Sequence, residues 1–243
     1  MDAAQIEEII RQHGPHISTS NGLATGTTQS VCRLTSSSGN KTPCRVRFKG
    51  SQSAEESGPA SPTDKGPPHN FSVVATGIFR SAFPYETNLP FLMGMQFRTI
   101  VTLVATEFDQ ETATWLASSG IKHYRIPIPA HKDGKTIPVA DLAQIMRIIT
   151  NPCNHPLLIH CNKGKHRTGC VVASFRALAA HNERTDWVAP GGDFIAEYVR
   201  HSEPKQRQAD VEFIQGLSPR DLYMAIAAIE EPVKPITAYG TDR

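Results

Sequence analysis

The pattern of hydrophobic and polar positions divides the chain into two regions of different character. Residues 15–69 are rich in Ser, Thr, Gly and Pro and contain few large apolar side chains. Such a composition buries too little apolar surface to offset the conformational entropy that folding removes. We therefore expect residues 1–69 to be largely disordered, apart from a short amphipathic helix over residues 2–13 that ends at Gly14.

From residue 70 onward, short apolar runs alternate with stretches in which apolar residues recur at helical spacing. The apolar runs predict β-strands over residues 71–74, 78–80, 98–104, 121–126 and 157–160. The helical spacing and the capping residues predict helices over residues 109–120, 138–149, 168–180, 193–201, 210–216 and 218–230. Trp115, Met93 and Met95 are expected to lie in the core.

This alternation of strands and helices predicts a fold of the α/β class. Its central sheet should be mostly parallel and flanked by helices, because consecutive parallel strands need crossover connections. We expect the folded region to span residues 70–217 and to be followed by a C-terminal helix and tail over residues 218–243. Active sites of such sheets lie at the carboxyl ends of central strands.

The strand predicted over residues 157–160 runs directly into the sequence His-Cys-Asn-Lys-Gly-Lys-His-Arg-Thr-Gly, residues 160–169. On a strand-to-helix turn, successive backbone N–H groups form a concave nest for anions, and the N-terminus of the helix adds partial positive charge. That field favours the thiolate form of Cys161. Arg167 can reach back over the nest and hold two phosphate oxygens with its planar guanidinium. Thr168 can hydrogen-bond the sulfur. The stretch therefore predicts phosphate chemistry through a cysteinyl-phosphate intermediate.

Other interpretations of this stretch agree less well with its residues. A buried cysteine is usually an inert small hydrophobe, but the spacing of Arg167 and Thr168 from Cys161 favours a functional role. A nucleotide-binding P-loop is excluded, because no glycine lies five residues before Gly164 and neither serine nor threonine follows Lys165. The nearby histidines do not follow zinc spacing and a basic loop repels cations, so we expect neither a metal nor another cofactor.

Charge is informative here only in its distribution. The chain carries 25 Lys and Arg residues against 23 Asp and Glu residues, a net charge of +2. Lys163, Lys165 and Arg167 lie within five residues, however, and no carboxylate occurs between positions 142 and 182. A compact basic cluster predicts a small, highly anionic ligand rather than nucleic acid.

The cysteines and the lack of targeting segments bear on the compartment. The five cysteines are odd in number, and their spacings match neither a disulfide framework nor a zinc knuckle. Neither a signal peptide nor an apolar stretch of membrane-spanning length is found in the sequence. We expect a reducing compartment, the cytoplasm in the first place and the nucleus as a second location, and no membrane span. The oligomeric state is not predicted.

Several motifs resemble a known family. They are Gly77-Ile78-Phe79-Arg80-Ser81 with Pro84, the run from Asn154 to Cys161, Gly164-Lys165-His166-Arg167-Thr168-Gly169-Cys170, Glu197-Tyr198, and Lys205-Gln206-Arg207. Over about residues 70–217 the chain resembles the cysteine-dependent protein tyrosine phosphatase superfamily. Within it, the chain is most similar to the atypical dual-specificity phosphatases of plants and fungi, which include inositol pyrophosphate phosphatases.

The resemblance implies a role for each matching residue. Cys161 would be the nucleophile and Arg167 the phosphate clamp. The loop that cradles the phosphate would consist of Asn162, Lys163, Gly164, Lys165 and His166, with Lys163 and Lys165 facing further phosphates. Lys132 matches a lysine on a flexible loop over the site, and Arg200, Lys205 and Arg207 match a later basic segment. For these last three residues, a solvated helix face with salt bridges is an equally simple explanation.

The general acid is less well defined than the nucleophile. Asp133 lies on a loop before Cys161, but turn chemistry explains it as well as catalysis does. Asp141 is accounted for by its place in the first turn of a helix, and His166 is an alternative proton donor. A phosphate monoester leaving group, with a pKa of roughly 6, needs little protonation. A poorly defined acid therefore favours a phosphoanhydride as the substrate.

The expected function is hydrolysis of the β-phosphate of an inositol pyrophosphate without a metal ion. The first alternative is a protein tyrosine or dual-specificity phosphatase that acts on a phosphoprotein. A flat, deep site with an aromatic rim would favour phosphotyrosine as the substrate. A basic bowl would favour the inositol. Further alternatives are a phosphate-binding scaffold without turnover, a sulfurtransferase and an arsenate reductase.

Overall fold

The computed structural model describes residues 66–131, 135–181 and 193–236. The helix expected over residues 2–13 and the disorder expected before residue 66 lie outside these ranges. The same holds for Lys132 and Asp133. Within the described ranges, no helix has the length and the apolar character needed to cross a bilayer.

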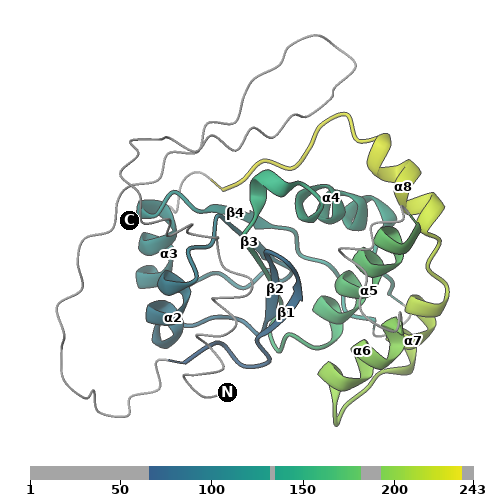
Figure 1. Cartoon of the computed structure of the whole chain (residues 1–243), viewed down its shortest axis with the longest axis horizontal. Helices are drawn as coiled ribbons and strands as arrows, with labels where there is room; N and C mark the ends of the chain where they lie inside the picture. The colour runs from purple at the N-terminus through teal and green to yellow at the C-terminus, as the bar shows by residue number, and fades with distance from the viewer. Residues whose placement is uncertain (1–65, 132–134, 182–192, 237–243) are drawn as a thin grey trace, which may run out of the picture. The chain divides into compact units, whose positions relative to one another are not determined.

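A five-stranded sheet forms the centre of the described fold, as Figure 1 shows. The strand order is β1-β2-β5-β3-β4, so the strand before Cys161 occupies the middle position. Only β1 runs antiparallel to its neighbour, and the other three pairings are parallel. The predicted α/β class with a mostly parallel sheet is confirmed. The strands are β1 (Ser72–Ala75), β2 (Ile78–Ser81), β3 (Thr99–Thr102), β4 (Lys122–Arg125) and β5 (Leu157–His160).

Helices flank both faces of this sheet (Figure 1). On one side lie α2 (Leu89–Gly94), preceded by the short 3-10 helix η1 (Glu86–Asn88), and α3 (Gln110–Ser118). On the other side lie α4 (Val139–Ile149), α5 (His166–His181), α6 (Phe194–Ser202), α7 (Gln208–Gln215) and α8 (Pro219–Ala227). A second 3-10 helix, η2 (Pro152–Asn154), leads into β5.

The core is divided by the sheet into two apolar clusters. Leu157 and Ile159 of β5 pack into the cluster that contains Phe175 of α5. Leu158, between them, packs into the other cluster with Leu116 of α3. Successive side chains of a strand point to opposite faces, and both faces of a parallel sheet are covered by helices. The continuous apolar run before Cys161 is therefore buried on both sides.

The predicted elements differ from the observed ones at α2 and at the start of α5. The α2 helix was not predicted, because six residues are too few to show a helical period. Met95 is buried as expected, whereas Met93 on α2 is 53% exposed, so its assignment to the core is wrong. The α5 helix begins at His166, two residues earlier than predicted. His166 and Arg167 consequently lie in its first turn.

The C-terminal helix belongs to the same core as the sheet. Leu222 of α8 is buried in the apolar cluster that also contains residues of α4 and α5. Beyond α8, the backbone N–H of Ile236 donates a hydrogen bond of 2.7 Å to the carbonyl of His123 on β4. The chain after residue 217 therefore completes the fold, at least as far as Ile236.

Candidate active site

The loop at the carboxyl end of β5 forms the centre of the candidate site. Cys161 follows the last residue of the strand, and the α5 helix starts five residues later at His166. Because β5 lies between β2 and β3, this loop emerges at the middle of the sheet edge. Ligands of open α/β sheets bind in that position. The predicted strand, loop and helix around the cysteine are thus confirmed.

A cavity of about 800 Å³ opens above this loop. Its lining residues are Ala130, Cys161, Asn162, Lys163, Lys165, His166, Arg167, Pro204, Lys205, Gln206 and Arg207. Cys161 is only 4% exposed and also contacts the apolar cluster, but its place in the cavity lining leaves the thiol accessible to a ligand. Cys170 is fully buried and does not line the cavity. Of these two free thiols, only Cys161 is positioned to react with a ligand in the cavity.

Two side chains hold the loop from the side opposite the cavity. Arg80 of β2 donates a hydrogen bond of 2.7 Å from Nη2 to the carbonyl of Gly164. Asn70 donates from Nδ2 to the same carbonyl, at 3.0 Å, and to that of Lys163, at 3.4 Å. The C=O and N–H groups of a trans peptide point in opposite directions. Since these carbonyls face Arg80 and Asn70, the N–H groups of the same peptides face the other way, as an anion nest requires.

Arg80 also places a positive charge behind the loop. Its side chain is completely buried, and burial lowers the pKa of the guanidinium to about 10, against the opposing effects of Glu197 and Cys161. The group therefore remains charged at neutral pH. Neither Nε nor Nη1 of Arg80 has a hydrogen-bond partner among the described residues. In the sequence, Arg80 belongs to a motif of the family resemblance, and an arginine inside an apolar strand is itself a signal of a buried functional charge.

Gly164 occupies a position in the loop that favours glycine. It does not line the cavity, and its φ of +64° lies in the left-handed region that favours glycine. A Cβ atom at this position would lie 2.5 Å from the backbone carbon of Ser81 and 2.6 Å from the nitrogen of Ala82. Glycine is therefore needed where the loop packs against the end of β2.

We expect Gly164→Ala to destabilise the protein and to impair phosphate release. Backbone strain alone costs about 1–3 kcal/mol, and the contact with the Ser81–Ala82 backbone forces the loop to shift. At about 2–4 °C per kcal/mol for a domain of this size, the melting temperature should fall by roughly 5 °C or more. Gly94→Ala is the matched control, because a Cβ there meets nothing within 4 Å and φ is not positive. Equal melting temperatures for the two variants would contradict this account.

The cavity is strongly basic. Five of its lining residues are cationic, namely Lys163, Lys165, Arg167, Lys205 and Arg207. No carboxylate and no Phe, Tyr or Trp is found among the described lining residues. Nε of Arg167 and Nη1 of Arg207 are buried without a hydrogen-bond partner in the described part of the chain. Buried donors are nearly always paired, so these two guanidinium groups are available to an anion in the cavity.

Two other residues predicted to belong to the site, Lys165 and Thr168, make contacts that differ from the expected ones. Lys165 lines the cavity, but its ammonium also donates to the carbonyl of Glu203 at the rim. Thr168 is fully buried and its hydroxyl has no partner among the described residues, so its expected hydrogen bond to the sulfur is not seen.

Arg200 is exposed on α6 and lies outside the cavity lining. Tyr198 and Ser202 provide the buried face of that helix, so a residue between them points elsewhere. Asp141 lies in the first turn of α4, as expected.

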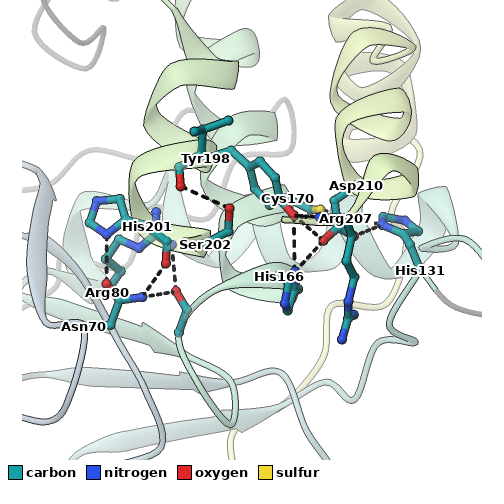
Figure 2. A network of polar contacts seen from close by, with 12 residues as sticks. Asn70, Arg80, His131, His166, Cys170, Tyr198, His201, Ser202, Arg207 and Asp210 are labelled. Carbon is teal, nitrogen blue, oxygen red and sulfur yellow. Dashed lines mark hydrogen bonds and ion pairs between the residues drawn. The ribbon is translucent and has the colours of Figure 1, made fainter. Parts of the chain in front are cut away.

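A buried carboxylate that no sequence motif indicates, that of Asp210, forms part of a network of polar contacts (Figure 2) and is hydrogen-bonded to His166 of the cavity lining. Asp210 accepts hydrogen bonds from Nδ1 of His131 at 2.7 Å, from Nδ1 of His166 at 2.8 Å and from the hydroxyl of Tyr198 at 2.7 Å. Burial would raise the pKa of Asp210, but these hydrogen bonds outweigh it and lower the pKa to about 2. Asp210 is therefore ionised at neutral pH.

The side chains of His131, Cys170 and Asp210 form the only group with metal-ligand geometry among the described residues. Their potential ligand atoms lie within 4.8 Å of one another. Burial and the neighbouring Asp210 raise the pKa of the Cys170 thiol well above its usual value, whereas cysteine binds metals as the thiolate. The carboxylate already accepts three hydrogen bonds. This arrangement fits a hydrogen-bond network centred on the Asp210 carboxylate better than a metal centre.

Comparisons with known proteins agree on one relationship. A model described as the tyrosine phosphatase family matches residues 66–225. A Saccharomyces cerevisiae protein named inositol diphosphatase SIW14 is 38% identical over 151 residues, which are 61% of this chain and 51% of that protein. Inositol diphosphatase DSP3 of Arabidopsis thaliana is 33% identical over 164 residues, 67% of this chain and 77% of that protein. This chain thus spans about half the length of the yeast relative.

The fold is similar to that of a solved relative. The crystal structure of the core catalytic domain of the PP-IP phosphatase SIW14 from S. cerevisiae, in complex with citrate, is 34% identical in sequence. The similarity has a TM-score of 0.56 and covers 66% of this chain and 93% of that one.

Proposed function

Because the chain belongs to the tyrosine phosphatase family, we propose that it is a cysteine-dependent phosphatase that removes the β-phosphate of inositol pyrophosphates. The reaction would proceed through a cysteinyl-phosphate intermediate and require no metal ion. The relatives in yeast and Arabidopsis that are named inositol diphosphatases support this substrate class.

The charge of the cavity is the observation on which this proposal rests. Five cationic side chains surround Cys161, and the described lining contains neither a carboxylate nor an aromatic residue of the Phe, Tyr or Trp type. A phosphotyrosine side chain presents one phosphate on an apolar ring, so apolar walls would be expected around it. A diphosphoinositol polyphosphate presents several phosphates at once. A basic cavity of about 800 Å³ is suited to the second kind of ligand.

The geometry supports an in-line displacement in two steps. In the first step the Cys161 thiolate forms a bond to the terminal phosphorus while the bond from phosphorus to the bridging oxygen breaks. The electron pair leaves with the inositol-bound phosphate. Arg167 and the N–H groups of the loop hold the equatorial oxygens, and this stabilisation increases as charge redistributes. In the second step water attacks the phosphorus, releases inorganic phosphate and restores the thiolate.

The leaving group reduces the need for a proton donor. A phosphate monoester has a pKa of roughly 6 and departs as an anion near neutral pH, whereas a tyrosine phenolate has a conjugate-acid pKa of about 10. His166 lines the cavity and remains our candidate donor from the described residues. Asp133 remains a candidate from the sequence alone.

A comparison of two substrates tests the proposal. Phosphate release from a diphosphoinositol pentakisphosphate and from a phosphotyrosine peptide should be measured with the same preparation of the full chain. We expect kcat/KM to be at least about 10²-fold higher for the inositol pyrophosphate, since hydrogen bonds from charged groups contribute about 1.5–3 kcal/mol each. A preference for the peptide would support a protein phosphatase. Release from neither substrate would support a binding scaffold.

Lys205 and Arg207 should contribute to this preference because they lie away from the cysteine loop in sequence and line the same cavity. We expect Lys205→Ala and Arg207→Ala each to raise KM for the inositol pyrophosphate about tenfold, with a much smaller change for p-nitrophenyl phosphate, which carries a single phosphate. Lys234→Ala is the matched control, because Lys234 is exposed and outside the cavity lining. Equal losses on both substrates would show that these residues do not recognise the additional phosphates.

A further inference from the structure

Asp210 joins three parts of the chain, two of which contribute residues to the cavity lining. His166 is in the cysteine loop region, next to Arg167. His131 follows Ala130, which lines the cavity, and Tyr198 belongs to α6. The three hydrogen bonds to the carboxylate span 44, 79 and 12 residues of sequence. A single side chain therefore connects segments that local structure alone would not hold together.

The carboxylate is well suited to fix these segments rigidly. The Asp210 side chain is 1% exposed, and it is ionised at neutral pH because its hydrogen bonds outweigh the effect of burial. Hydrogen bonds to ionised groups are roughly twice as strong as neutral ones. Removing one partner of a buried charged network also leaves the others unsatisfied. The positions of His131, His166 and Tyr198 thus depend on the same group.

The network also reaches Arg207. The hydroxyl of Tyr198 accepts a hydrogen bond of 3.3 Å from the backbone N–H of Arg207. The backbone N–H of Asp210 donates to the carbonyl of Arg207 at 3.1 Å. Figure 2 shows the side chains of His166 and Arg207 extending in the same direction from Asp210. Both of these side chains line the cavity, whereas Asp210 does not.

We propose that Asp210 is the positioning residue of this site, which holds His166 and Arg207 in the orientations that the substrate requires. The proposal rests on the proposed phosphatase function, and it assigns Asp210 no contact with substrate. Displacing catalytic groups by about 1 Å can lower the rate on the order of 10²-fold. The loss of the Asp210 carboxylate should therefore reduce turnover strongly, although Asp210 does not line the cavity.

The first test compares Asp210→Asn with Asp221→Asn in the full chain. The asparagine keeps the size of the side chain but removes the charge. We expect kcat/KM for p-nitrophenyl phosphate and for the inositol pyrophosphate to fall on the order of 10²-fold in Asp210→Asn. Asp221 is exposed in the first turn of α8, and its variant should retain wild-type activity. Wild-type activity in a folded Asp210→Asn variant would overturn the proposal.

A double-mutant cycle separates positioning from a general loss of structure. If Asp210 acts through His166, Asp210→Asn should lower kcat for p-nitrophenyl phosphate less than threefold in a His166→Ala background. With the inositol pyrophosphate, an increase in KM should remain in that background, because Arg207 is still displaced. An equal fold-loss in both backgrounds, for both substrates, would show that Asp210 has only a structural role.

The kinetics of Tyr198→Phe and the zinc content of the purified protein provide two further tests. If Asp210→Asn does not fold, Tyr198→Phe removes one hydroxyl from the network and should lower kcat/KM about tenfold; unchanged kinetics would then overturn the proposal. One equivalent of zinc in the purified wild-type protein that is lost in Asp210→Asn would also overturn it, since Asp210 would be a metal ligand. Should the wild type cleave only the aryl phosphate, the proposed substrate fails, while the effect of Asp210 is still measured.

Discussion

Cys161→Ser is expected to abolish phosphate release while the protein still binds its substrate. Loss of a covalent nucleophile lowers turnover on the order of 10⁵-fold or more, because a serine hydroxyl is far less ionised than a thiol at neutral pH. Substrate binding should persist, since the five cationic side chains of the cavity are unchanged. Single-turnover phosphate release measures the first effect, and isothermal titration with the inositol pyrophosphate measures the second.

A neighbouring cysteine provides the control for this experiment. Cys153 lies in η2 and does not line the cavity. Cys153→Ser should therefore retain nearly full activity. Substantial turnover by Cys161→Ser would show that the thiol is not the nucleophile, even though the fold is that of the family. Loss of both turnover and binding, with an unchanged melting temperature, would instead show that the sulfur is needed to keep the loop in its conformation.

Arg167→Lys should lower kcat about 10³-fold or more even though the positive charge remains. The guanidinium is planar and can donate two parallel hydrogen bonds to a phosphate, whereas an ammonium acts as a point charge. An arginine that stabilises the charge of a phosphoryl transition state contributes 10³–10⁵ in kcat. The side chain lies in the first turn of α5, lines the cavity and has its Nε buried without a partner. Its guanidinium therefore has a hydrogen-bond donor available for a phosphate oxygen in the cavity.

The same substitution elsewhere on the surface distinguishes this effect from a general cost of replacing arginine. Arg220 is exposed on α8, so Arg220→Lys should leave kcat and KM unchanged. KM for the inositol pyrophosphate should change much less than kcat in Arg167→Lys, because Arg207 and three lysines still bind the phosphates. A large increase in KM with an unaltered kcat would place Arg167 among the residues that only bind substrate.

The parts of the site that are contiguous in sequence were predictable. A β-strand, a turn and a helix each leave a local signal, through apolar runs, capping residues and helical spacing. Cys161 and Arg167 lie on one such turn, and the structure places both in the lining of one cavity. The segment with Lys205 and Arg207 reaches the same cavity, but only the family resemblance indicates a role for it. Arg200 belongs to the same sequence region and lies outside the cavity, because α6 turns it away.

The supports of the site could not be predicted in the same way. Arg80 binds the carbonyl of Gly164 across 84 positions of sequence, and Asp210 binds His131 across 79. Such pairs leave no periodic pattern, because they depend on which segments the packed sheet and helices bring together. Arg80 is an isolated charge in an apolar strand, and Asp210 is the third residue of a short helix. Neither position reveals its partner.

Local sequence therefore determined the α/β class, the thiol at the end of a central strand and the basic character of the loop that follows it. The order of the strands, the donors behind the loop and the buried carboxylate beside it were decided only by the tertiary structure. The reason is physical: secondary structure and charge density arise from neighbouring residues. The orientation of a catalytic group is set by hydrogen bonds to residues that only the packed core brings within 3 Å.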